Sequence, residues 1–342
     1  MIWLTWRQFR VQALTLIIPL AALAVALVWT EPGLAHLYSA NGLNRCAVPG
    51  DCGQRTTAFL AAVQASKYPL GYFVGGAVLY LFPAVIGAFW GAPLICGELA
   101  AGTHRLVWNQ TVGRTRWLAV KLAVGGAVAM AATALLSLAV GWWSGPIDTA
   151  VNATATSVSP VGFWFPRLAP ELFPARGVVP VGYTAFAFML GVTLGLLLRR
   201  LLPAMALTGV GYLAVQFAMS LWGRGTLLAP DHLVMRINGH FNIDRLGTIL
   251  SGVPEPGAWV TGERLTDAAG QTAAMPSWAP QCFGNGPRSQ ACLTRMHQLY
   301  RVAVSYQPAG RFWTFQWYEL AIYLGLAVGL AALCAYWIRV RV

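Results

Sequence analysis

The sequence has few charged residues and almost no lysine. Only 10% of its 342 residues are charged, whereas a soluble domain typically has about 25%, so a soluble globular fold is excluded. Lysine occurs only at Lys67 and Lys121, and neither is preceded by glycine or followed by serine or threonine. A phosphate-binding loop ends in Gly-Lys-Ser/Thr, so this chain does not bind ATP by such a loop.

Acidic residues are also scarce. There are 11 of them against 23 Lys and Arg, which gives a formal net charge of +12. A basic balance often indicates a nucleic-acid partner, but 57% of the residues here are hydrophobic. Basic residues gather beside membrane spans as topology signals and headgroup contacts. The composition therefore favours membrane lipid over nucleic acid as the partner.

Six apolar runs are long enough to cross a bilayer, for which a helix needs roughly 20 mostly apolar residues. They are 11–29, 70–95, 117–143, 181–198, 202–222 and 315–338. Pro83 and Pro93 interrupt the second run, and Pro203 lies in the first turn of the fifth, where proline is tolerated. The sequence therefore predicts an all-α integral membrane protein with six transmembrane helices.

The first residues of the chain alternate aromatic and basic side chains. Trp3, Trp6 and Phe9 alternate with Arg7 and Arg10, which predicts an N-terminal amphipathic helix lying in the membrane interface. The alternative is a plain extension of the first span. A signal peptide has an apolar region of about 7–15 residues; this run is longer, so we expect it to be retained as an anchor.

An even number of spans puts both termini on one side of the membrane. The basic residues on that side are Arg7, Arg10, Arg105, Arg114, Arg116, Lys121, Arg199, Arg200, Arg339 and Arg341, against the single acid Glu98. The positive-inside rule then places both termini in the cytoplasm of a multi-pass cell-membrane protein. Residues 1–222 would hold five spans and a cytoplasmic loop at 96–121, residues 223–312 a small extracellular domain, and residues 313–342 the sixth span.

Four cysteines fall in the predicted external segments. Cys46 and Cys52 flank one turn-like sequence, and Cys282 and Cys292 flank another. Disulfides persist outside the cell, so we expect the local pairs Cys46–Cys52 and Cys282–Cys292, although four cysteines allow three connectivities. A metal site is the competing interpretation. Neither pair has a two-residue spacing or a nearby histidine pair, so we expect no metal.

A short polar island separates the second and third apolar runs. It reads Gly97-Glu98-Leu99-Ala100-Ala101-Gly102-Thr103-His104-Arg105 and is followed by Arg114-Thr115-Arg116-Trp117 and Lys121. Its spacing, Glu-x-x-x-Gly-Thr and then Arg-x-Arg-Trp-x-x-x-Lys, resembles the cytoplasmic loop of the type-2 class of ABC exporter permeases. The specific motif covers only this loop, and the long 223–312 segment departs from the family's pattern.

The resemblance implies that this loop lies on a separate ATPase subunit and couples ATP hydrolysis to movement of the spans. The implied coupling residues are Glu98, Gly102, Thr103, His104, Arg105, Arg114 and Arg116. It also implies two ATPase copies that hold ATP and magnesium, a second permease copy in a homodimer, and no cofactor or catalytic residue in this chain. The exported substrate would be amphipathic or hydrophobic: a drug, a lipid-like metabolite or a peptide. The alternative is a basic loop that only fixes topology.

Two polar residues within the apolar runs are candidates for a translocation path. Gln216 lies in the fifth run and Glu319 near the start of the sixth, and an ionisable residue at membrane depth is a functional candidate. Gln216 could instead bond a neighbouring helix. Glu319 could pair with Arg311, or lie at the water interface without a special role.

A cluster of acids and histidines follows the fifth run. It consists of Asp231, His232, Arg236, His240 and Asp244. Such residues bind metals or perform acid–base chemistry, but their spacing matches no motif, so solvated surface residues are favoured. The alternative functions are a membrane-embedded enzyme acting through His232, His240 and Asp244, or a ligand-sensing or immunity subunit that moves no substrate.

Overall fold

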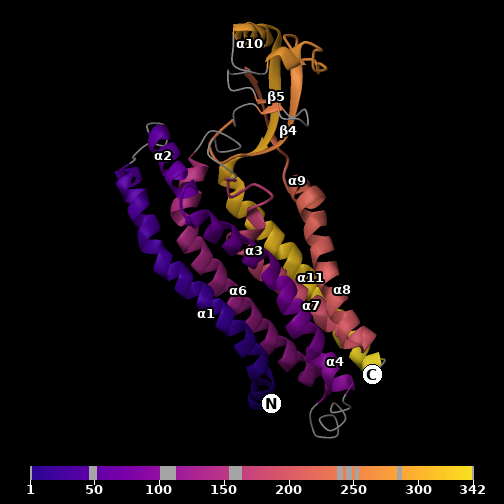
Figure 1. The fold of residues 1–342 in the computed structure, drawn as a ribbon. Coiled ribbons are helices and arrows are strands. Elements are labelled where there is room, and N and C mark those ends of the chain that lie inside the picture. The colour runs from indigo at the N-terminus through magenta and orange to yellow at the C-terminus, as the bar shows by residue number, and fades with distance from the viewer. Residues whose placement is uncertain are drawn as a thin grey trace.

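The computed structural model describes residues 2–45, 52–100, 113–153, 164–236, 242–243, 249–250, 254–282 and 287–340. Long helices lie side by side in a bundle, and a small sheet domain stands on one end of it (Figure 1). Both chain termini lie at the opposite end. We call these the sheet end and the termini end of the bundle.

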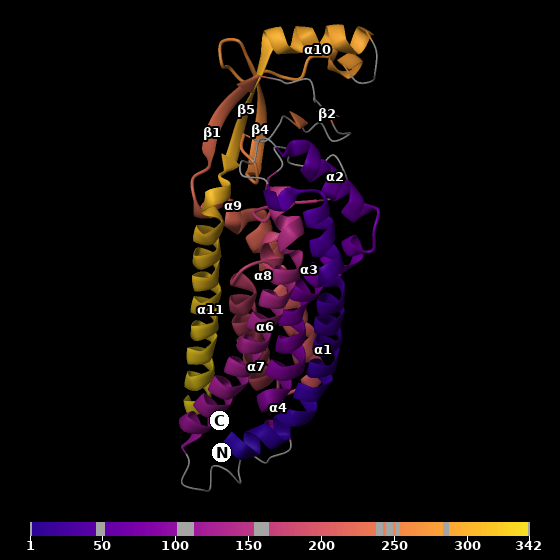
Figure 2. The same cartoon turned by 90° about the vertical axis from the view of Figure 1, so that its left-hand side faces the viewer.

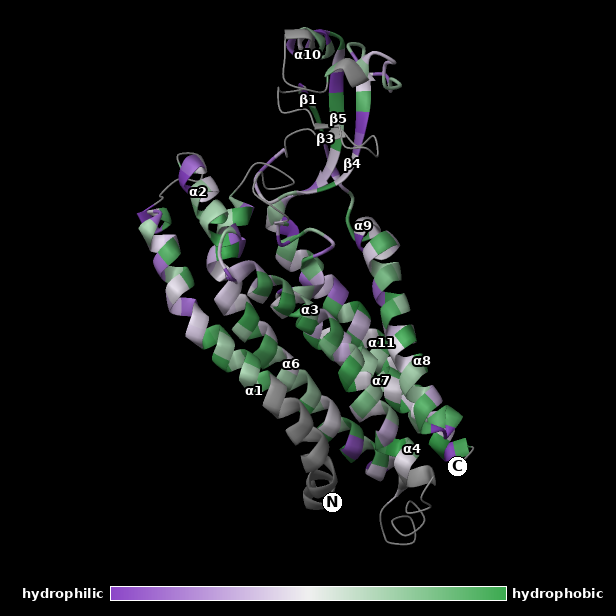
Figure 3. Ribbon diagram, viewed as in Figure 1, coloured by the Kyte–Doolittle hydropathy of each residue, from purple (hydrophilic) through white to green (hydrophobic). Residues whose placement is uncertain are grey.

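Six helices in the described part of the chain are long and apolar enough to cross a membrane, which confirms the predicted fold class. They are α1 (Ile2–Ala40); α3 (Tyr68–Ile86) with its continuation α4 (Ala92–Ala100); α6 (Arg114–Asn152); α7 (Val179–Leu198); α8 (Leu201–Ala218) with its continuation α9 (Arg224–Leu227); and α11 (Phe312–Val340). Single π-helical turns, Gly87–Gly91 and Met219–Gly223, join α3 to α4 and α8 to α9. Most residues of the bundle helices are apolar, and polar residues are more frequent toward the sheet end, including α2 and the sheet domain (Figure 3).

Two helices differ from the sequence-based expectation. Helix α1 is continuous from Ile2 to Ala40, so the first residues do not form a separate helix. That they lie in the membrane interface stays a prediction. Helix α6 runs on to Asn152, because Ile147 and Val151 are buried beyond the predicted end of its span. At 1.5 Å per residue its 38-residue span is about 57 Å long. A hydrocarbon core is only about 30 Å thick, so α6 is longer than the core that it would cross.

Helix α7 lies at the centre of the bundle and is the most buried of the six spans. Its backbone approaches the π-turn of the second span closely. A Cβ atom added at Gly191 would lie 2.1 Å from the carbonyl oxygen of Gly87, and one added at Gly87 would lie 2.4 Å from that of Ala187. Small residues permit such close helix contacts in membranes, and here glycine is required.

The sheet domain contains three antiparallel strands in the order β1-β5-β4. These are β1 (Asp231–Arg236), β4 (Trp259–Asp267) and β5 (Tyr300–Gln307), and a short pair is formed by β2 (Asn242–Ile243) and β3 (Ile249–Leu250). Helix α10 (Pro287–Leu299) lies across the far end of the sheet (Figure 2). Met296 of α10 packs in a small core with Val302 and Val304 of β5.

The remaining elements are short. They are α2 (Gly53–Gln64), which packs against the sheet end of α6, and the 3₁₀ turns η1 (Leu43–Arg45), η3 (Phe173–Ala175), η5 (Ala279–Cys282) and η6 (Ala309–Arg311). Turn η3 belongs to residues 164–178, which connect to α7 at the sheet end and which we call the cap segment. Gly177 of this segment has φ +70°, and a Cβ there would lie 2.5 Å from Gln316 Oε1, so only glycine fits.

Candidate functional site

The two elements that flank the predicted coupling loop, the end of α4 and the start of α6, lie at the termini end of the bundle (Figure 1). Glu98 is in the last turns of α4. Arg114 begins α6, and Arg116 is exposed. Lys121, five residues after Arg116, is buried, and its ammonium lies 4.9 Å from the centre of the Trp117 ring. Gly102, Thr103, His104 and Arg105 fall outside the described residues, so their coupling role stays a prediction.

Gln216 is buried, bonds one neighbouring helix directly and is linked to a second through Tyr212. Its Nε2 donates to the Tyr212 hydroxyl at 3.1 Å, and its Oε1 accepts from the Tyr323 hydroxyl of α11. The Tyr212 hydroxyl in turn donates to the carbonyl oxygen of Tyr80 in α3 at 3.0 Å. Gln216 therefore ties the fifth span to the second and sixth. The sequence left two roles open for Gln216, a place in a translocation path or a bond to a neighbouring helix, and the structure shows the bond.

Glu319 is fully buried and paired with a residue that sequence reasoning missed. Arg224 donates to it twice, from Nε to Oε2 at 2.9 Å and from Nη2 to Oε1 at 3.0 Å, and the Tyr183 hydroxyl donates to Oε1. The expected partner Arg311 is wrong, because Arg311 pairs with Asp231 at 2.8 Å. The alternative of a water-interface position is also wrong, since the Glu319 side chain has no exposed surface.

The π-turn of the fifth span sets the position of Arg224. The turn ends at Gly223, and Arg224 begins α9 immediately after it. A π-turn inserts an extra residue into a helix and occurs frequently at functional sites. Arg224 could have been found from the sequence as a charged residue at the end of an apolar run, but nothing in the sequence pairs it with Glu319.

A second buried ion pair lies at the sheet end. Arg176 of the cap segment donates from Nε to Asp148 Oδ2 at 2.7 Å and from Nη2 to Oδ1 at 3.3 Å. Asp148, in α6, also accepts from Tyr72 at 2.7 Å and from Ser144 at 2.9 Å. Burial lowers the pKa of Arg176, but Asp148 and Tyr72 raise it, and the net pKa lies above its ordinary value. The guanidinium therefore stays charged. Neither Asp148 nor Arg176 stood out in the sequence.

The acid and histidine cluster is not brought together as far as the structure describes it. His232 Nδ1 lies 2.9 Å from Ser305 Oγ across the β1–β5 pair, and Asp231 is held by Arg311. Arg236 is an exposed residue of β1. His240 and Asp244 lie outside the described residues. Within those residues, no group of three His, Cys, Asp or Glu could hold a metal ion.

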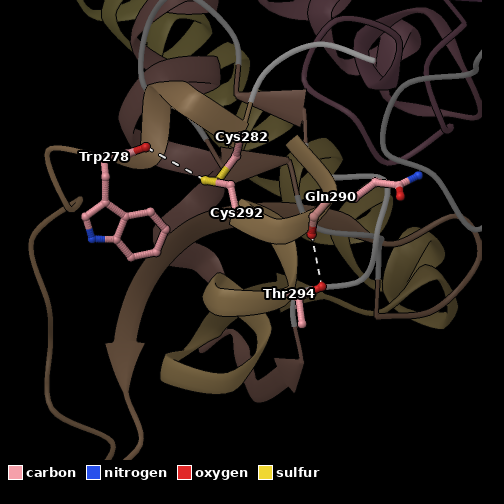
Figure 4. Close-up of a disulfide and its surroundings, with 5 residues drawn as sticks. All are labelled: Trp278, Cys282, Gln290, Cys292 and Thr294. Atoms are coloured by element: carbon pink, nitrogen blue, oxygen red, sulfur yellow. Dashed lines mark hydrogen bonds between the residues drawn. A yellow bond between two sulfur atoms is a disulfide. The ribbon is translucent and has the colours of Figure 1, made fainter. Parts of the chain in front are cut away.

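One predicted disulfide is confirmed. Cys282, at the end of η5, is bonded to Cys292 of α10, and the sulfur of Cys292 lies 3.8 Å from the carbonyl oxygen of Trp278 (Figure 4). The bond fastens α10 to the segment that precedes it. Cys52 is buried, whereas Cys46 falls outside the described residues, so the pairing Cys46–Cys52 stays a prediction.

The six spans and the buried polar contacts between them define a multi-pass membrane protein. A family model described as ABC-2 membrane transporter related matches residues 17–224, well over half of the chain. The chain belongs to this family and is a membrane component of a transporter. The matched region runs from the first span to Arg224, close to the end of the fifth span at Leu227. Comparison with curated proteins and with solved structures gave no match.

Proposed function

We propose that this chain is the permease subunit of an ATP-driven exporter that moves an amphipathic or hydrophobic substrate, such as a drug, a lipid-like metabolite or a peptide. The family match over the first five spans is the observation that carries the proposal. Because the sequence has no Gly-Lys-Ser/Thr loop, a separate ATPase subunit would bind ATP and magnesium. Two ATPase copies and a second permease copy complete the proposed assembly.

We further propose that the termini end faces the cytoplasm and the sheet end the exterior. Several basic residues support this orientation: Arg199 and Arg200 between α7 and α8, Arg116 at the start of α6, and Arg339 in the last turn of α11. Basic residues favour the cytoplasmic side. The Cys282–Cys292 disulfide at the other end is consistent with an oxidising exterior.

Coupling would occur between the ATPase and the residues that join α4 to α6. The residues proposed for this contact remain Glu98, Gly102, Thr103, His104, Arg105, Arg114 and Arg116. A cation held over an aromatic ring resists displacement, so the contact between Lys121 and Trp117 would stiffen the start of α6. A push on the loop would then be passed to the helix.

The test is to purify the tagged chain from its native membrane in mild detergent and identify what accompanies it by mass spectrometry. The expected result is a stoichiometric partner that carries a Gly-x-x-x-x-Gly-Lys-Ser/Thr loop. Antibody capture of an unrelated multi-pass protein from the same membranes controls for non-specific carry-over. A preparation that contains no such partner, even after crosslinking in the membrane, overturns the proposal.

A further inference from the structure

The cap segment, residues 164–178, covers the sheet end of the bundle with almost no regular secondary structure. Trp164, Leu168, Phe173, Ala175 and Arg176 are all at most 4% exposed. Turn η3 is its one helical turn in the described residues. A loop usually lies on the surface because its backbone groups need water, so this burial requires specific partners.

The first set of partners is on α6 and α3. Besides its two bonds to Asp148, the Arg176 guanidinium lies 4.9 Å from the centre of the Tyr72 ring. The Ser137 hydroxyl donates to the carbonyl oxygen of Gly177 at 2.7 Å. The span of α6 is longer than a hydrocarbon core, and Asp148 lies near its sheet end. Asp148 also lies beyond the apolar run 117–143 predicted for this span, so we place this ion pair near the headgroups.

The second set of partners is on α9 and α11. The Arg224 guanidinium, bonded to Glu319, lies 4.3 Å from the centre of the Phe173 ring. Phe173 also packs edge-on against Phe312, the first residue of α11, with ring centres 5.7 Å apart. Phe173 begins the short turn η3, and Arg176 follows its last residue. The turn is thus held between the two buried ion pairs.

A third contact fixes the backbone of the cap segment to α11. Gln316 Oε1 accepts from the N–H groups of Val178 and Val179 at 2.9 and 3.0 Å, and its Nε2 donates to the carbonyl oxygen of Arg176 at 3.0 Å. One side chain therefore satisfies three backbone groups that would otherwise need water. Trp164 Nε1 is the one buried side-chain polar atom among the described residues of the cap segment that has no hydrogen-bond partner.

Buried ion pairs of this kind suit an element with two states. The attraction within a buried pair roughly offsets its desolvation, so replacing it with apolar residues is often neutral or stabilising, whereas separating the charges in a dry interior is strongly unfavourable. Near the headgroups, displacement of the cap segment would hydrate the separated charges. Arg224 Nη1 is buried with no hydrogen-bond partner in the described part of the chain, and entering water would satisfy it.

We propose that the cap segment is a gate over the sheet end of the bundle, latched by Arg176 on Asp148 and by Phe173 on Arg224, and that it opens to water during transport. The proposal deepens the proposed function and rests on it for the transport step. Closed, the gate seals the sheet end with paired charges. Open, it frees the ends of α6 and α11 from each other.

The test introduces a cysteine at a buried position of the gate itself and measures its labelling by a membrane-impermeant maleimide added from the sheet side. Ala169→Cys places a thiol at a position only 6% exposed, and Glu171→Cys, at an exposed position of the same segment, is the accessible control. The parent chain gives the background, because Cys96 and Cys334 are free but buried. We expect Ala169→Cys to react at least tenfold more slowly than Glu171→Cys.

Breaking the latch should expose the thiol. Asp148→Asn in the Ala169→Cys chain is expected to raise the labelling rate tenfold or more. Asp231→Asn is the matched control, since it breaks an Arg–Asp pair whose side chains are 32% and 43% exposed and should leave labelling unchanged. Unchanged labelling of the Asp148→Asn chain, with an unfolding temperature near that of the parent, overturns the latch.

The transport step is tested with the latch intact, which also covers the case in which latch variants fold poorly. Ala169→Cys is labelled in the complex with its co-purifying ATPase, with and without ATP turnover, and turnover should increase the rate severalfold. Equal labelling rates with and without turnover, while substrate is moved, would show that the cap segment is a static cover and would overturn the proposal that it is a gate. Absence of any ATPase partner would contradict the proposed function instead. Labelling of Ala169→Cys with and without Asp148→Asn would still decide whether Asp148 holds the cap segment.

Discussion

Glu319 and Arg224 form a bidentate ion pair with N–O distances of 2.9 and 3.0 Å, and at most 1% of either side chain is exposed. The pair joins the end of the fifth span to the sixth, and Tyr183 adds a bond from the fourth. Three helices that are separate in the sequence are thereby tied at one point.

Removing one member of this pair should destabilise the bundle. Glu319→Ala leaves Arg224 as an uncompensated buried cation, which costs about 3–5 kcal/mol in folding free energy. The double variant Glu319→Leu with Arg224→Met removes both charges and should recover most of that loss. Unfolding in detergent, followed by circular dichroism, measures both. A double variant no more stable than Glu319→Ala would contradict the pair's assignment.

The close approach of α7 to the second span should not tolerate even one added methyl group. Gly191→Ala would place a Cβ 2.1 Å from the Gly87 carbonyl oxygen, and such overpacking destabilises a protein by about 1–3 kcal/mol or more. Gly329→Ala in α11 is the control, because nothing lies within 4 Å of a Cβ there. Thermal unfolding should separate the two variants, and equal melting temperatures would show that α7 packs elsewhere.

Gln316 should be more important than a typical exposed glutamine near a span boundary. Gln316→Leu removes the partner of three backbone groups, and each buried group left unpaired costs about 1–3 kcal/mol. Hydrogen exchange of residues 176–179, measured by mass spectrometry, should accelerate. Gln290→Leu, at an exposed position of α10, should leave that exchange unchanged. Unaltered exchange in Gln316→Leu would mean that its bonds do not hold the cap segment.

Reduction of the Cys282–Cys292 disulfide should loosen the sheet domain without unfolding the bundle. The bond closes a loop with a sequence separation of 10, for which chain entropy predicts about 2.5–3 kcal/mol of stabilisation. In the double variant that carries Cys282→Ser and Cys292→Ser, limited proteolysis should cleave within residues 254–307 and leave the membrane spans intact. Cys334→Ala is the control. Cleavage of the spans at the same protease concentration would show that the two parts unfold together.

Variants of the proposed coupling residues should lose transport activity but still assemble with the ATPase. Glu98→Ala or Arg105→Ala should abolish stimulation of the ATPase by substrate, and transport with it, while the complex still co-purifies. Arg295→Ala, on α10 at the opposite end, should change neither. Retention of both activities in Glu98→Ala and in Arg105→Ala would reduce the loop to a topology signal.

Much of the fold could be predicted from the sequence because each span carries its own signal. A run of about 20 apolar residues must be helical in lipid, where every backbone polar group needs a partner within its own segment. Gln216 and Glu319 could likewise be singled out, since polar residues are rare in such runs. Their partners could not be predicted. Arg224 is 95 residues away from Glu319, and no local pattern encodes that distance.

The sequence by itself determined the class of protein, the number of spans and the polar loop whose spacing resembles that of exporter permeases, because these depend on local composition and short-range spacing. Only the tertiary structure decided that Arg176 meets Asp148, that Gln216 bonds Tyr323 of the sixth span, and that the segment before α7 is buried as a cap. Such contacts arise from how helices pack, and packing depends on shape complementarity between residues far apart in the chain.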